Sequence, residues 1–101
     1  MQSLTLRFSE TVRILADRAR RAGLDMPAVR SPPEHPDADR TIRRRDDGGI
    51  TVCVRLKDRP FAAVIADLID AILTTNDVAP GDQQPIRRDM WKALADLGFV
   101  E

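Results

Sequence analysis

Arginines gather in the middle of the chain, where they could bind phosphate groups. The run Arg43 to Arg45 lies between Arg40 and Arg55. Guanidinium groups on a two-stranded ribbon can contact phosphates or enter a groove of a duplex. No aromatic residue lies among them, which argues against a base-stacking surface, and nearby aspartates dilute the charge. The cluster therefore has two interpretations, a nucleic-acid surface or a solvated sheet face, and the second is the commoner origin of such a run.

A nucleophile and its base could be built only from Cys53 and His35, the sole cysteine and the sole histidine. Cys53 falls in a predicted strand with no helix terminus beside it, and His35 falls in a proline-rich loop that would have to fold across to reach it. We therefore interpret Cys53 as a small side chain on a sheet face and His35 as a solvated residue. The sequence predicts no catalytic residues and a protein that is not an enzyme.

Asp67 and Asp70 are spaced i, i+3 and could hold a divalent cation with a third ligand. Neither His nor Glu lies beside them, and two carboxylates leave most of a coordination shell to water. We expect them to form the solvent edge of a helix or to pair with arginines such as Arg40 or Arg44. No glycine-rich phosphate loop is present either, so the sequence predicts neither a metal nor a cofactor.

The element expected to position these residues is a buried helix over residues 60–76. Pro60 suits a first helical turn, and Asp58 could cap the free amides. The apolar side chains recur at the i, i+3, i+4, i+7 spacing of one helical face: Phe61, Val64, Ile65, Leu68, Ile69, Ile72 and Leu73. This helix is predicted to be the core of the domain.

Residues 40–56 read as a β-hairpin that runs directly into this helix. A three-residue loop of Asp47, Gly48 and Gly49 places Ile42 opposite Val54. The same loop places Arg44 opposite Val52 and Arg40 opposite Leu56. A two-residue turn at Asp47 and Gly48 would instead place Ile42 opposite Cys53 and reverse one strand's side chains. Burial of Ile42 favours the longer loop.

That register divides the hairpin into an apolar face and a basic face. The inward face is formed by even-numbered side chains, namely Ile42, Ile50, Val52, Val54 and Leu56. The outward face carries Thr41, Arg43, Arg45, Thr51, Cys53 and Arg55. The residues predicted to contact nucleic acid or a partner are Arg43, Arg45, Thr51 and Arg55.

The segment before the hairpin, residues 24–39, holds four prolines and is longer than an ordinary connection. These prolines exclude a helix and a central strand. Residues 30–36 could form an extended, polyproline-like arm. A connector crossing the sheet edge is favoured over a ligand-binding arm, whose contacts would be Arg30, Ser31, Pro32 and Pro33.

A helix is expected at each end of the chain. Residues 3–8 fit either a strand or a helix, and from Ser9 a helix is predicted that ends at Gly23, with Leu24 folding back. The last helix should run from about residue 82 or 84 to residue 97, with Pro85 in its first turn. The apolar stripe of this helix comprises Ile86, Met90, Ala93, Leu94 and Leu97, with Trp91 at its border. Gly98 would end the helix, and Phe99 would fold back onto Leu94.

Length and charge favour one small cytoplasmic domain over residues 1–101. The formal net charge is zero, with 16 basic and 16 acidic residues, so no global field attracts nucleic acid or a membrane. A single cysteine gives no intrachain disulfide, which favours a reducing compartment. The chain starts without the apolar core of a signal peptide, and its longest wholly apolar run, residues 61–66, is too short to span a bilayer. No membrane association is expected.

Two resemblances extend beyond composition. From residue 50 to 97 the predicted order of strand, helix and helix is that of ribbon-helix-helix DNA-binding proteins, which would place Thr51, Cys53 and Arg55 in the major groove. An upstream strand already offers residues 50–56 a partner, so this stays an alternative. The chain also resembles small uncharacterised proteins of GC-rich actinobacteria. The resemblance lies in five segments: RRAGL at 20–24, RSPP at 30–33, DRTIRRR at 39–45, RP at 59–60 and AD at 66–67. That resemblance implies a cytoplasmic bacterial protein and no catalytic residues.

The sequence thus predicts an α+β fold: helix, long Pro-rich loop, two-stranded antiparallel hairpin, central buried helix and C-terminal helix. A lone hairpin is marginally stable, and pairing two copies would protect its strands. The leading functional hypothesis is therefore a non-enzymatic, self-associating protein-binding or adaptor domain. We expect it to form a homodimer and to bind a further protein whose identity the sequence does not give. The alternative is a nucleic-acid-binding regulatory protein. A third hypothesis is small-ligand binding under the Pro-rich loop.

Overall fold

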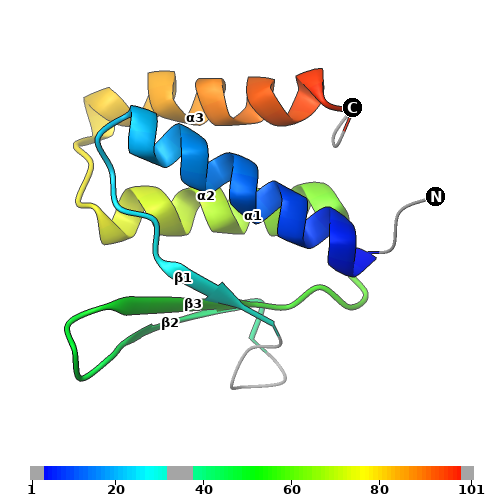
Figure 1. The fold of residues 1–101 in the computed structure, drawn as a ribbon, viewed down its shortest axis with the longest axis horizontal. Helices are drawn as coiled ribbons and strands as arrows, with labels where there is room; N and C mark the ends of the chain where they lie inside the picture. The colour runs from blue at the N-terminus through cyan, green and yellow to red at the C-terminus, as the bar shows by residue number, and fades with distance from the viewer. Residues whose placement is uncertain (1–3, 32–37, 99–101) are drawn as a thin grey trace. The chain divides into compact units, whose positions relative to one another are not determined.

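The computed structural model describes residues 4–31 and 38–98 and has the predicted α+β fold (Figure 1). The element order is helix, three strands, helix and helix. The chain divides into two compact units, one formed by residues 27–77 and the other by residues 1–26 with 78–101. None of the described helices is both long enough and apolar enough to cross a membrane.

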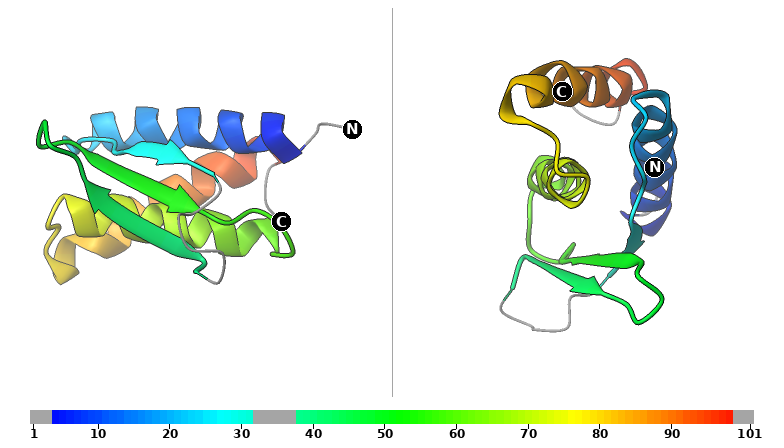
Figure 2. Two further views of the ribbon diagram at one scale, coloured as in Figure 1. Left: turned by 90° about the horizontal axis from the view of Figure 1, so that it is seen from below. Right: turned by 90° about the vertical axis from the view of Figure 1, so that its left-hand side faces the viewer.

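Residues 27–77 contain a sheet of three strands, one more than the sequence predicted. β3 (Ile50–Val54) is central, paired antiparallel with β2 (Arg40–Arg44) and parallel with β1 (Ala28–Arg30) (Figure 2). β1 follows Pro27 directly and lies at a sheet edge, where neighbouring prolines are tolerated. The hairpin is therefore not a lone ribbon, because both edges of β3 are paired within the chain.

The hairpin loop has the predicted length but lies one residue earlier. Its residues are Asp46, Asp47 and Gly48, with Gly48 in the left-handed conformation at φ 86°. The Arg45 N–H donates to the Gly49 oxygen at 2.7 Å, and the Gly48 N–H donates to the Arg45 oxygen at 3.0 Å. The Asp47 carboxylate accepts the Gly49 N–H at 2.8 Å, a local contact that fixes the turn at this position.

The shift corrects the predicted strand partners but keeps the faces. Ile42 lies opposite Val52, Arg44 opposite Ile50 and Arg40 opposite Val54. Because even-numbered residues still pair with even-numbered residues, side chains keep their predicted side of the sheet. Val52 and Val54 are fully buried, as predicted, whereas Ile42, on the edge strand, is 43% exposed. Thr51 and Cys53, on the other face of β3, are each only 8% exposed.

The predicted core helix is α2 (Phe61–Thr75), which packs against β3 (Figure 1). Its buried side chains are Val64, Ile65, Leu68, Ile69, Ala71, Ile72 and Leu73. Pro60 is the N-cap residue, just before the first turn, and no side chain caps the helix. Asp58 therefore does not cap α2; its backbone has φ 60°, in the left-handed region, where it makes the turn out of the strand.

The second unit contains α1 (Leu4–Arg21) and α3 (Pro80–Asp96), which contact each other. The helical option is therefore correct for residues 4–8. At the end of α1, Gly23 has φ 77° and the Leu24 N–H donates to the Ala19 oxygen at 2.8 Å, which confirms the predicted stop.

α3 differs from its predicted bounds at both ends. It begins at Pro80, so Pro85 lies inside the helix rather than in its first turn. Met90, Ala93 and Leu94 are buried as predicted, but Leu97 is 60% exposed because the helix ends before it. Gly98 takes the left-handed conformation at φ 77°, whereas Phe99 lies outside the described residues. Trp91 is partly exposed, as expected at a border.

Candidate anion-binding site on the sheet

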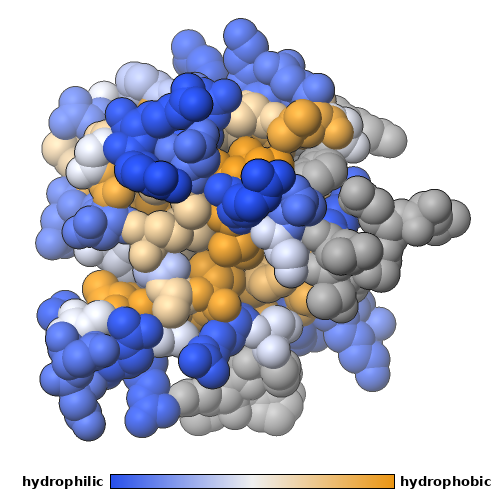
Figure 3. Space-filling view, viewed as in Figure 1, coloured by the Kyte–Doolittle hydropathy of each residue, from blue (hydrophilic) through white to orange (hydrophobic). Residues whose placement is uncertain are grey.

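The outer face of the sheet in residues 27–77 holds a pocket of about 380 Å³, which we call the arginine pocket. Four arginines are among the residues that line it. The surface around the turn of the β2–β3 hairpin is hydrophilic (Figure 3). The residues that line the pocket are Arg30, Arg43, Arg44, Arg45, Asp46, Thr51 and Cys53. Guanidinium groups outnumber carboxylates here, so the pocket is a local cationic site on a chain of zero net charge.

Strand pairing explains why these side chains meet. Arg30 in β1 lies opposite Cys53, and Arg43 in β2 lies opposite Thr51. Directly paired residues project to the same side of a sheet, so arginines from both flanking strands rise beside the central strand. Thr51 and Cys53 are small and nearly buried, and they form the floor between the arginines.

Arg45 is held in place within this pocket. Its Nε donates to Asp47 Oδ1 at 3.2 Å, and its Nη1 donates to Thr51 Oγ1 at 3.4 Å. The guanidinium lies over Gly49, where an added Cβ would come within 2.0 Å of Nη2. The Gly49 N–H, and then Arg45, lower the pKa of Asp47 below its ordinary value, so this carboxylate stays charged and orients Arg45.

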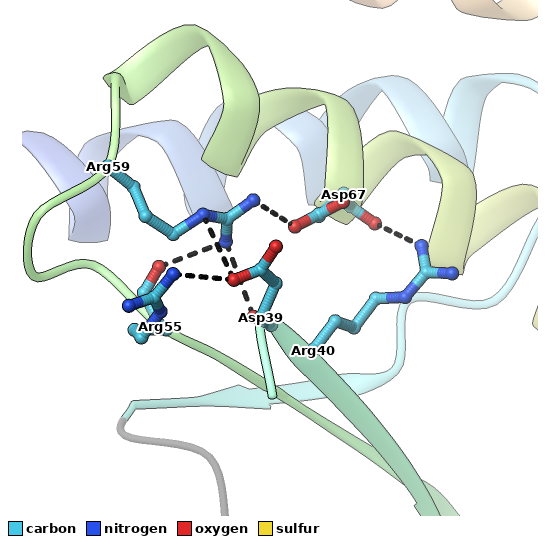
Figure 4. A network of polar contacts seen from close by, with 5 residues as sticks. All are labelled: Asp39, Arg40, Arg55, Arg59 and Asp67. Atoms are coloured by element: carbon cyan, nitrogen blue, oxygen red, sulfur yellow. Dashed lines mark hydrogen bonds and ion pairs between the residues drawn. The ribbon is translucent and has the colours of Figure 1, made fainter. Parts of the chain in front are cut away.

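Arg55, predicted to contact a partner, is directed elsewhere. Its Nη2 donates to Asp39 Oδ1 at 2.7 Å at the base of the hairpin (Figure 4). This hydrogen bond lowers the pKa of the exposed Asp39 carboxyl. Of the four predicted hairpin contacts, Arg43, Arg45 and Thr51 line the pocket, and Arg55 does not.

Asp67 belongs to the same polar network. It forms an ion pair with Arg59, and its backbone oxygen accepts a hydrogen bond from Arg40 at 3.1 Å (Figure 4). Pairing with an arginine was predicted, but its side-chain partner is Arg59 rather than Arg40 or Arg44. Across residues 4–31 and 38–98, no group of three or more His, Cys, Asp or Glu residues could hold a metal ion.

The residues predicted for the loop contact separate in the structure. Arg30 lines the arginine pocket, whereas Ser31 is exposed and is not part of its lining. Pro32 and Pro33 lie outside the described residues, as does His35, the proposed partner of Cys53. The sequence did not predict that Arg30 lies in one pocket with the hairpin arginines. β1 has only three residues and pairs with a strand that is distant in sequence, so no periodic pattern in the sequence around Arg30 indicates the pairing.

The sheet also bears on the resemblance to ribbon-helix-helix proteins. In that arrangement the strand before the two helices pairs with the same strand of a second subunit. Here β3 is paired on one edge with β1 and on the other with β2. β3 therefore has no free edge for such pairing, and Thr51 and Cys53 form a pocket floor instead of projecting into a groove.

Comparison with known proteins adds no family to this description. No protein-family model matches the chain, and no significant match was found among curated proteins or solved structures.

Proposed function

We propose that this protein is a non-enzymatic domain that binds double-stranded nucleic acid through the arginine pocket and the adjoining β2–β3 hairpin. The observation that carries the proposal is that Arg30, Arg43 and Arg45, which lie on one face of the sheet, line the same pocket. Each guanidinium is permanently charged and presents a planar set of donors that matches phosphate oxygens.

The chemistry of the pocket favours the phosphates over the bases. Its lining contains no aromatic residue that could stack on an unpaired base. Thr51 is nearly buried, and its hydroxyl accepts a hydrogen bond from Arg45, so its role is to support the arginine. A duplex, whose bases are already stacked, is the ligand that such a phosphate-binding surface fits best.

Salt dependence follows from this proposal. Each phosphate that an arginine neutralises releases condensed counterions, which gives a slope of about −0.9 in log K against log salt for B-DNA. A surface that engages about three phosphates through the pocket and the adjoining hairpin together should show a slope of roughly −3. Binding should therefore weaken steeply between low and physiological salt.

A titration of fluorescently labelled duplex DNA and duplex RNA at several salt concentrations tests the proposal by anisotropy. Arg43→Gln should weaken binding and reduce the magnitude of the slope by about 1. Arg88→Gln, an exposed change on α3 in the other unit, is the matched control and should leave both unchanged. Absence of salt-dependent binding, or equal effects of the two variants, would contradict the proposal.

A self-associating adaptor domain is a second proposal, supported by the exposed edge strand. β2 lies at an edge of the sheet, and its Ile42 is 43% exposed. Antiparallel pairing of two β2 strands about Ile42 would, however, place Arg44 opposite Arg40 of the second copy, and this like-charge contact is unfavourable. A dimer of this kind should strengthen as salt screens the arginines, and light scattering that shows a monomer at high micromolar concentration and high salt would reject it.

A further inference from the structure

We infer that the arginine pocket receives a phosphomonoester, such as the terminal phosphate of a nucleic-acid strand or of a nucleotide, in preference to an internal phosphodiester. This inference rests on the proposed binding of nucleic acid and specifies which chemical group enters the pocket.

The first support is the shape of the site. A β-ribbon that binds along the sugar-phosphate backbone of a nucleic acid would carry its arginines in a row along its strands. Here Arg30 and Arg43 come from the two strands that flank β3, so they lie on opposite sides of the Thr51 and Cys53 floor. The pocket is open to solvent on one side, and its volume of about 380 Å³ falls in the range of small-ligand sites. Such a pocket fits a terminal phosphate, which is attached to the ligand on one side only, better than an internal phosphodiester, which continues into the strand on both sides.

The second support is charge. A phosphomonoester carries about −1.5 to −2 charges at neutral pH and three terminal oxygens, whereas an internal diester carries one charge and two such oxygens. The guanidinium groups of Arg30, Arg43 and Arg45 supply more charge and more N–H donors than one diester can use. The monoester satisfies more of these donors, and the difference in charge makes it the stronger ligand.

The third support is the arrangement at the rim. Arg45 is fixed by Asp47 and Thr51 before any ligand binds, so little conformational entropy is lost when it donates to an anion. A preset donor at the rim therefore favours an anion compact enough to enter the pocket and reach it.

The test compares probes that differ only at the strand end. The unmodified 101-residue chain is titrated with one duplex sequence bearing a 5′-phosphate, a 3′-phosphate or a 5′-hydroxyl, and with a covalently closed dumbbell that has no ends. We expect at least one phosphorylated end to bind about tenfold more tightly than the hydroxyl duplex or the dumbbell. Competition by adenosine monophosphate then separates the two sources: displacement at a similar concentration supports a free nucleotide, and no displacement supports a strand end.

Two variants locate the preference in the pocket. Arg30→Gln should abolish the preference for a phosphorylated end, whereas the control Arg88→Gln should keep it. If Arg30→Gln fails to fold by circular dichroism, Arg30→Lys replaces it; this variant keeps the charge but loses bidentate donation, and should reduce the preference severalfold.

The outcomes separate this inference from the proposed function. Equal binding of all duplex probes would overturn the phosphomonoester inference while leaving nucleic-acid binding intact. A preference that survives in the folded Arg30 variant would also overturn it. Failure of every duplex probe to bind would overturn both proposals.

Discussion

Arg59 donates from Nη2 to Oδ2 of Asp67 at 2.5 Å, which connects the turn before α2 to the second turn of that helix. The Arg59 side chain is only 8% exposed. Its Nη1 also donates to the backbone oxygens of Asp39 at 3.3 Å and Arg55 at 3.1 Å (Figure 4). One guanidinium therefore joins the start of β2, the end of β3 and α2, and fixes the base of the hairpin that carries the arginine pocket.

Removing the charge of Asp67 should destabilise the protein. Asp67→Asn leaves the nearly buried Arg59 with only its longer ion pair to Asp39, at 3.8 Å, which should cost about 1 to 3 kcal/mol in the free energy of unfolding. Glu10→Gln is the control, because the Glu10–Arg13 pair is exposed and should contribute less than about 0.5 kcal/mol. Urea unfolding followed by circular dichroism measures both changes. Equal effects would show that burial of Arg59 does not matter.

The Asp39 carboxyl should make stability depend on pH in the acid range. Its hydrogen bond from Arg55, together with the charge of Arg59, lowers its pKa below the ordinary value of 3.8. A lowered pKa favours the folded state when the carboxyl is charged, so this contribution is complete above the ordinary pKa and is lost as the pH falls through the folded value. The stability difference between wild type and Asp39→Asn should therefore shrink as the pH falls below about 4. Urea titrations from pH 2 to 7 that give a constant difference would argue against this assignment.

Gly49 and Gly48 should respond differently to alanine. At Gly49 the new Cβ would displace the Arg45 guanidinium, a flexible group, so nucleic-acid affinity should fall while stability changes by less than about 0.5 kcal/mol. Gly48 has φ 86°, and alanine there should cost about 1 kcal/mol of stability. Gly81→Ala, with no atom within 4 Å of its Cβ position, is the control for binding. Unchanged affinity of Gly49→Ala would show that the position of Arg45 is unimportant.

Two isoleucines test the assignment of the core. Ile69 is fully buried on α2, and Ile69→Ala should cost about 2 to 5 kcal/mol. Ile42 is 43% exposed on β2, and Ile42→Ala should cost less than about 1 kcal/mol, because little apolar area is lost from the interior. Thermal and urea unfolding provide the comparison. A large loss for Ile42→Ala would indicate that this face of β2 is covered in solution, as the self-associating domain requires.

The sequence by itself determined the features that depend on local chemistry. The apolar spacing of residues 61–73 defined α2, because one face of a helix must be buried wherever it packs. Gly23 and Gly98 marked helix ends, because few other residues adopt a left-handed conformation without strain. The faces of the hairpin were also predicted correctly, because a three-residue loop conserves the alternation of side chains wherever it is placed.

Only the tertiary structure decided which distant residues meet. The parallel pairing of β1 with β3 brings Arg30 to the same pocket as Arg43, although the proline-rich segment separates them in sequence. The contact of Asp47 with Gly49 sets the position of the turn, and that position places Ile42 opposite Val52. Arg55 pairs with Asp39 and Arg59 pairs with Asp67, so neither arginine contributes to the pocket. Such choices depend on contacts between strands and helices that are far apart along the chain, and local periodicity carries no information about them.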